Sequence, residues 1–149
     1  MTETLLVLHI LSAAAWIGGG LLNGYLGPKM AAAGGPVAIQ WLKVGIQAGG
    51  RYFVPAGVLT GLTGIALVLV DDAYDWSDGF VGIGLAIVVI SLGLAVWVLI
   101  PAAKGALAAA EAGDFPAVAP KARRAGLTGR VMVVLLILAE VSMVLRLGA

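Results

Sequence analysis

The feature that most constrains this chain is a set of four apolar runs, each about as long as a membrane is thick. They cover about residues 5–26, 52–70, 80–102 and 131–147. A membrane-spanning helix needs about 20 mostly apolar residues, and helices satisfy their own backbone hydrogen bonds inside lipid. The sequence therefore predicts an all-α integral membrane protein. We expect residues 1–149 to form a single transmembrane domain, an up-down-up-down bundle of four helices in the lipid bilayer.

The composition excludes several other classes of protein. Of the 149 residues, 61% are hydrophobic and only 11% are charged, whereas a soluble domain carries about 25% charged residues. The chain has no cysteine, which excludes disulfides, thiolate metal sites and cysteine nucleophiles. Its basic residues are scattered beside the apolar runs, so no nucleic-acid-binding patch is predicted.

The charged residues indicate how the chain is oriented in the membrane. The second connection, "DDAYDWSDG", holds four aspartates and no basic residue. Eight of the nine lysines and arginines lie in or beside the first and third connections: Lys29, Lys43, Arg51, Lys104, Lys121, Arg123, Arg124 and Arg130. By the positive-inside rule, these two connections are cytoplasmic and both termini face outward.

Each of the three connections also has a predicted structure. In the first, "GPVAIQWLKVGIQAGG" places Val37, Trp41 and Val44 at helical spacing but is too short to span. We expect a short interfacial helix there, lying on the cytoplasmic face. The third, "EAGDFPAVAPKARR", is predicted to be a solvated turn with a basic cluster. The acidic connection is expected to be a solvated turn as well, with Tyr74 and Trp76 in an interfacial aromatic belt.

The first apolar run contains His9, the only histidine of the chain. At 100° per residue, His9 falls on one stripe of the helix with Ala13, Trp16, Gly20 and Asn23. Small and polar residues on one stripe mark the side that packs against other helices, because lipid does not favour their exposure. We therefore expect His9 to point into the bundle, about 6 Å below its outer boundary.

The fourth run contains Glu140, and a carboxylate within a span costs roughly 2.5–3.5 kcal/mol unless it faces the interior with a partner. Glu140 lies about 9 Å below the level of Arg146, so it can share its depth with His9. Several roles compete for this pair. His9 can bond structurally to Glu140 or to a backbone carbonyl, or serve as an axial haem ligand oriented by such a group. It can also bind a transition metal such as copper with Met143, Met1 or the acidic connection, or relay protons.

The second run, "RYFVPAGVLTGLTGI", carries Gly57, Thr60, Thr63 and Gly64 on one face. This pattern predicts close helix packing, with the threonines bonding to their own backbone. Arg51 lies at the predicted cytoplasmic end of the run. It is interpreted as a topology anchor, with a haem propionate or an anionic lipid as the alternative partners.

Three stretches of the chain resemble a known superfamily of four-helix bacterial membrane proteins. The first is "LHILSAAAWIGGGL", which contains His9, Trp16, Gly18 and Gly19. The others are "RYFVPAGVLTGLTGIAL" and the closing "EVSMVLRLG", with Met143 and Arg146. The superfamily includes the CopD-type copper-resistance domain, the HemJ-type protoporphyrinogen oxidase and an uncharacterised group of integral membrane proteins. The chain is most similar to that uncharacterised group.

The resemblance implies a location in the bacterial cytoplasmic (inner) membrane, which the Ala- and Gly-rich composition also favours. It implies haem b bound through His9, with Glu140 and Arg51 in supporting roles. CopD-like copper handling, through His9 and Met143, is one alternative. An accessory subunit of a larger membrane complex, or a homo-oligomer, is another. The third run, "WSDGFVGIGLAIVV", has neither the lysine nor the second histidine of HemJ-type enzymes, so oxidase activity is not predicted.

Overall fold

The structure is a computed structural model, and it describes residues 2–149. Its elements are α1 (Thr2–Ala33), α2 (Gly35–Ala48), α3 (Val54–Val70), α4 (Gly79–Leu94), α5 (Ile100–Glu111), α6 (Phe115–Val144) and two π-helical turns, η1 (Gly49–Phe53) and η2 (Ala95–Leu99). Through η1, α2 and α3 form one helix over residues 35–70, and through η2, α4 and α5 form one over 79–111. The described chain thus has four continuous helices that are long and apolar enough to cross a membrane. The predicted all-α, four-helix membrane bundle is confirmed.

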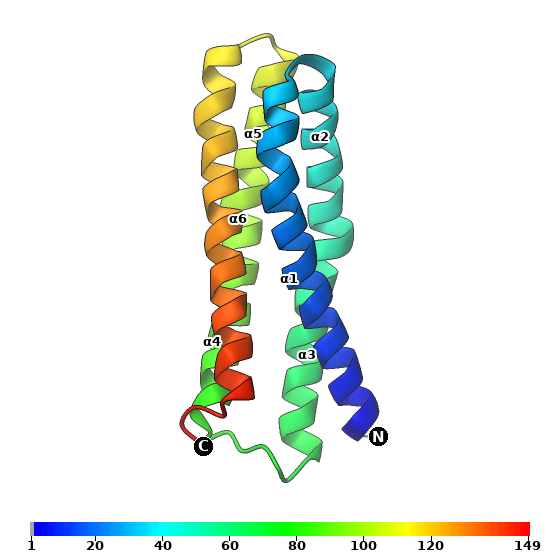
Figure 1. The fold of residues 1–149 in the computed structure, drawn as a ribbon, viewed down its shortest axis with the longest axis vertical. Helices are drawn as coiled ribbons and strands as arrows, with labels where there is room; N and C mark the ends of the chain where they lie inside the picture. The colour runs from blue at the N-terminus through cyan, green and yellow to red at the C-terminus, as the bar shows by residue number, and fades with distance from the viewer. Residues whose placement is uncertain (1) are drawn as a thin grey trace.

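The four helices run side by side and alternate in direction (Figure 1). Both termini and the 71–78 connection lie at one end of the bundle, which we call the terminal end. The turns between α1 and α2 and between α5 and α6 lie at the opposite end. Each helix exposes large apolar side chains on its outer side, for example Leu11, Leu62, Val89 and Val134. An outer surface of this kind suits contact with lipid.

The predicted interfacial helix is the main correction to the fold. Residues 35–48 are helical, as predicted, but they stand upright in the bundle and continue into α3 (Figure 1). Pro55 was expected to lie at the start of a separate span. Instead, the backbone N–H of Val54 donates to the carbonyl of Gly49, a π-type bond that widens the turn just before the proline. The wider turn accommodates a residue that lacks an N–H and crowds the preceding turn.

The third long helix also contains a proline that follows a π-helical turn. Pro101 follows η2, where the N–H of Ile100 donates to the carbonyl of Ala95. The chain therefore stays helical through both prolines, and the helices reach 30 to 36 residues. At 1.5 Å per residue they are about 45–54 Å long, against a hydrocarbon core of about 30 Å. The predicted spans lie toward the terminal end, so the extra helical length extends the bundle at the opposite end.

The third connection is also shorter than predicted. Only residues 112–114 lie outside helices, and α6 begins at Phe115. Asp114 caps α6 by accepting a hydrogen bond from the N–H of Ala117. Pro116 falls in the first turn, where its missing N–H is tolerated. An ion pair between Lys43 and Glu111, with Nζ and Oε1 2.8 Å apart, joins the second and third helices at this end.

The core of the bundle lies around Trp16, which is only 2% exposed. A Cβ built on Gly57 would come within 2.7 Å of Cη2 of Trp16, so only glycine lets the indole approach α3 this closely. The buried core cluster comprises Trp16, Ile87, Val88, Ala95, Met132, Leu136 and Ala139. The indole fixes α1 against α3, and His9 follows on α1 about two turns nearer the terminal end.

Candidate functional site

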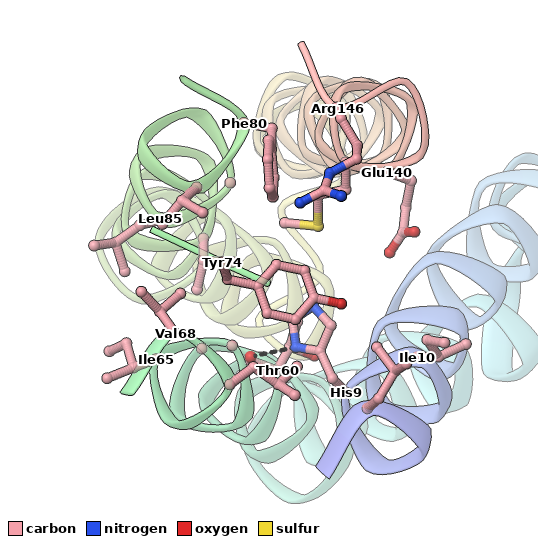
Figure 2. Close-up of a pocket in the computed structure, with 18 of the residues that line it drawn as sticks. His9, Ile10, Thr60, Ile65, Val68, Tyr74, Phe80, Leu85, Glu140 and Arg146 are labelled. Atoms are coloured by element: carbon pink, nitrogen blue, oxygen red, sulfur yellow. Dashed lines mark hydrogen bonds between the residues drawn. The ribbon is translucent and has the colours of Figure 1, made fainter. Parts of the chain in front are cut away.

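The terminal end of the bundle contains a cavity of about 380 Å³, lined by all four long helices and the 71–78 connection. Its walls are mostly apolar, with a few convergent polar groups on them: His9, Thr60, Tyr74, Glu140 and Arg146. Figure 2 shows these side chains converging from α1, α3 and α6, from the 71–78 connection and from the turn after α6. A size of 300–1,000 Å³ and this mixture of lining groups are typical of small-molecule sites.

The cavity lies between two tightly packed helix pairs. In this half of the bundle, α1 packs mainly against α3, and α4 mainly against α6. Hydrogen bonds join the first pair: Tyr52 Oη donates to the Ala15 carbonyl at 2.8 Å, and Thr60 Oγ1 donates to Ser12 Oγ at 2.9 Å. In the second pair, the Met143 side chain packs against the bare backbone of Gly84. Fewer contacts join α3 to α4, which leaves room for the cavity between the pairs.

His9 is fixed by α3. Its Nδ1 lies 2.9 Å from the carbonyl oxygen of Thr60 and 3.1 Å from Oγ1 of Thr63. Since a carbonyl oxygen only accepts, Nδ1 carries the proton. The Thr63 hydroxyl donates to the Leu59 carbonyl at 2.7 Å, so it also accepts from Nδ1. In the neutral imidazole, Nε2 is therefore unprotonated and free to bind a metal ion or accept a hydrogen bond.

The contact with α3 shows which of the predicted partners His9 bonds to. A bond to a backbone carbonyl was one of the structural alternatives, and the carbonyl belongs to the second long helix, which sequence reasoning did not identify. Within residues 2–149, no hydrogen bond or ion pair joins His9 to Glu140, although both line the cavity. Thr63 bonds to its own backbone as predicted, and the single hydroxyl proton of Thr60 is shared between the Ser12 hydroxyl and the Ala56 carbonyl. The face that the two threonines share with Gly64 was the signal that pointed toward His9.

The predicted stripe of α1 is confirmed in part. Ala13 and Trp16 are buried, and His9 is half-buried. Gly20 packs so closely that an added Cβ would come within 2.6 Å of Val133. Asn23 is exposed, so its expected inward position was wrong. At its depth, α1 lies beside α2, which has no buried residue, so this part of the stripe is not enclosed by neighbouring helices.

The opposite wall of the cavity belongs to α6. Glu140 is half-buried, and its carboxylate extends from α6 toward α1 (Figure 2). Met143 lies one turn further toward the terminal end, with its methyl group against Gly84. A Cβ on Gly84 would overlap that methyl group, so the Met143 side chain would have to shift if Gly84 were replaced. One imidazole, one carboxylate and one thioether thus line the same cavity.

The mouth of the cavity was not predicted. Arg146 Nη2 donates to the Ala73 carbonyl at 2.6 Å, and its guanidinium carbon lies 6.0 Å from the ring centre of Tyr74 and 5.6 Å from that of Phe80. Figure 2 shows Tyr74 and Arg146 extending over the cavity. Two sequence signals bear on this arrangement: Tyr74 belonged to the predicted aromatic belt, and Arg146 was the single basic residue expected at this end.

Arg51 lies apart from the other predicted site residues. It is exposed on η1 and is not part of the cavity lining. Nine residues separate it from Thr60, or about 13 Å along the helix. The structure therefore does not bring Arg51 together with His9 and Glu140.

A metal centre built from several carboxylates or imidazoles is not formed by the described chain. No group of three or more His, Cys, Asp or Glu side chains gathers within residues 2–149. Met1, one of the expected copper ligands, lies outside the described residues. In the acidic connection, hydrogen bonds from the hydroxyl and the backbone N–H of Ser77 lower the pKa of Asp75. The carboxylates of Asp71 and Asp78 accept from backbone N–H groups, as in the solvated turn that was predicted.

Comparison of the chain with protein-family models, with curated proteins and with solved structures finds no match. The likeness to the CopD- and HemJ-containing superfamily therefore stays a prediction from the quoted stretches. The case for a function rests on the geometry of the cavity.

Proposed function

We propose that this multi-pass membrane protein binds haem b in the cavity at its terminal end, with His9 Nε2 as an axial ligand of the iron. One observation carries the proposal: the Thr60 carbonyl accepts from Nδ1 of His9 at 2.9 Å. Histidines that ligate metals commonly donate their other ring N–H to a carbonyl or carboxylate, which fixes the tautomer and the ring orientation. His9 has this arrangement in a cavity of ligand size.

The rest of the lining suits a large, mostly apolar cofactor. The walls are apolar side chains from all four helices, with polar groups only at a few points. The thioether of Met143 belongs to the other helix pair, so it is the candidate for a second axial position. His/Met ligation raises the reduction potential of haem iron. When bound, haem would supply one-electron chemistry, while the protein holds it, orients it and excludes water.

The orientation of the protein is part of the proposal. By the positive-inside rule, the terminal end, with its aspartate-rich connection, faces outward. The opposite end, which carries Lys43, Lys104 and most of the other basic residues, faces the cytoplasm. The proposed membrane is the bacterial inner membrane, which the sequence resemblance supports. The haem cavity would then open near the outer face.

The test is an absorption spectrum of the detergent-purified protein, oxidised in air and then reduced with dithionite. The protein is produced in cells supplied with a haem precursor. We expect a Soret band with resolved α and β bands after reduction, and we expect His9→Ala to remove it. The matched control is Asn23→Ala, which alters an exposed polar side chain on the same helix and should keep the spectrum.

A folded wild type without a Soret band would contradict the proposal, and so would a band that persists in His9→Ala. Metal analysis and partner analysis of the same preparation separate the two alternatives. Stoichiometric copper would favour a copper site at His9 and Met143. A protein partner in fixed ratio, without haem or copper, would favour an accessory subunit of a larger complex.

A further inference from the structure

The cavity has a cation at its mouth that the binding of iron does not use. Arg146 lines the cavity but has no ion-pair partner. Within residues 2–149, the structure contains one ion pair, between Lys43 and Glu111 at the opposite end of the bundle. Glu140 lines the same cavity without pairing with Arg146. The guanidinium is therefore available for a negatively charged group of a ligand.

Arg146 is also held in position. One N–H of its guanidinium donates to the Ala73 carbonyl, and the aromatic rings of Tyr74 and Phe80 lie next to the planar group. A guanidinium has five N–H donors in a fixed fork, a geometry that matches a carboxylate with two parallel hydrogen bonds. Because one donor is used for positioning, the remaining donors are free. The backbone helps as well, since the Gly79 N–H donates to the Gly148 carbonyl and ties the C-terminal turn to α4.

No aspartate of the 71–78 connection forms an ion pair with this cation. The carboxylates of Asp71, Asp75 and Asp78 accept hydrogen bonds from neighbouring groups of the same connection. Ser77 gives Asp75 a second hydrogen bond through its hydroxyl. The connection thus uses its carboxylates to hold its own turns.

We propose that the ligand of the cavity is an apolar acid, and that Arg146 binds its carboxylate at the mouth while the apolar body lies between the two helix pairs. Haem b belongs to this class because it carries two propionates, so the inference rests on the proposed function and extends it. The sequence analysis gave Arg51 as an alternative partner of a haem propionate. The inference assigns this carboxylate-binding role to Arg146 instead. Arg146 is a positioning residue, since it contacts the side groups of the ligand and not the iron.

The test uses a porphyrin without iron, so that binding does not depend on the bond to His9 Nε2. Protoporphyrin IX and its dimethyl ester are titrated, by porphyrin fluorescence, into the full-length protein in detergent. We expect the wild type to bind the free acid about three- to fivefold more tightly than the ester, as one ion pair at an exposed arginine allows. Arg146→Gln should reduce this ratio to about one, because it keeps a donor for Ala73 but removes the charge. Arg146→Lys should keep most of the preference.

Arg51→Gln is the matched control, because it removes an arginine that lies outside the cavity and should keep the wild-type ratio. Titration of the two porphyrins into detergent micelles without protein corrects for their partition into detergent. Equal affinity of the wild type for acid and ester would overturn the inference, as would a preference that survives in Arg146→Gln. Binding of neither porphyrin would overturn it too.

The two proposals fail in different ways. An acid preference that depends on Arg146, together with a Soret band that does not depend on His9, would keep this inference and refute axial ligation by His9. A Soret band that requires His9, together with equal affinity for acid and ester, would refute only the role of Arg146.

Discussion

Adding a single methyl group at Gly64 perturbs His9 without touching its side chain. A Cβ at this position would lie 3.0 Å from Cε1 of His9 and 3.4 Å from its Nδ1. Non-bonded carbon atoms prefer separations of about 3.5–4.0 Å, so the imidazole must move by roughly 0.5–1 Å in Gly64→Ala. A shift of this size lengthens the 2.9 Å contact between Nδ1 and the Thr60 carbonyl to the limit of a hydrogen bond.

The expected magnitude follows from that lost hydrogen bond. A hydrogen bond of this kind contributes about 1 kcal/mol net, which corresponds to about a fivefold change in the ratio of the two imidazole tautomers. Loss of the group that orients a metal-ligating histidine lowers metal affinity about 10- to 100-fold. We therefore expect Gly64→Ala to fold, to show a mixture of tautomers, and to bind haem at least about tenfold more weakly.

The tautomer can be measured directly because His9 is the only histidine of the chain. Selective ¹⁵N-histidine labelling gives the NMR signals of one imidazole, recorded at a pH where the ring is neutral. The wild type should carry its proton on Nδ1 and leave Nε2 bare. Gly82→Ala is the matched control, because a Cβ at Gly82 meets nothing within 4 Å. A wild-type proton on Nε2 would refute the assigned geometry, and so would a Gly64→Ala protein with wild-type tautomers and wild-type haem affinity.

Two further predictions concern stability and pH. Gly57→Ala should lower the free energy of unfolding in mixed micelles by about 1–3 kcal/mol, because its Cβ would overpack against Trp16. Gly18→Ala, with open space around the new atom, should be neutral or slightly stabilising, and equal stability of the two variants would contradict the packing. Ser77→Ala should raise the pKa of Asp75 toward its ordinary value of 3.8, because it removes the hydrogen bond that lowers this pKa most. Since the pKa of Asp75 is lower in the folded than in the unfolded protein, its ionised carboxylate stabilises the fold above the unfolded pKa. This stabilisation is lost as the pH falls through the folded pKa. An NMR titration of Ser77→Ala with an unchanged pKa of Asp75 would contradict this cause.

Hydropathy and charge were sufficient to predict four spanning helices and the acidic connection between the second and the third. Four runs of spanning length predict four helices, because backbone groups in lipid must bond within their own segment. The polar stripe of α1 predicted the burial of Trp16 correctly, since the bundle interior is the only favourable place for such a stripe. It failed at Asn23, because a helical stripe gives a direction but not how closely the neighbouring helices pack at each depth.

The ends of the helices were harder to predict, because two prolines and a change from apolar to mixed composition resembled boundaries. Pro55 and Pro101 are instead absorbed by π-helical turns. The energy of a widened turn depends on the helices packed around it, so a local rule for proline cannot distinguish a break from a π-turn. The helices continue beyond the predicted spans because the π-helical turns keep the chain helical through both prolines.

The sequence by itself determined that this is a four-helix membrane protein, and it predicted that His9 faces the interior and that Glu140 can share its depth. Only the tertiary structure decided that His9 bonds to Thr60 and not to Glu140, and that Arg146 rather than Arg51 lies at the cavity. The physical reason is that the contacts of a side chain depend on how far its helix is rotated about its axis and shifted along it. Hydropathy is nearly unchanged when an apolar helix turns or slides in lipid, whereas the fit of Trp16 against Gly57, and of Met143 against Gly84, is lost after a small rotation. Close packing of a few large side chains against glycine therefore sets the partners of His9.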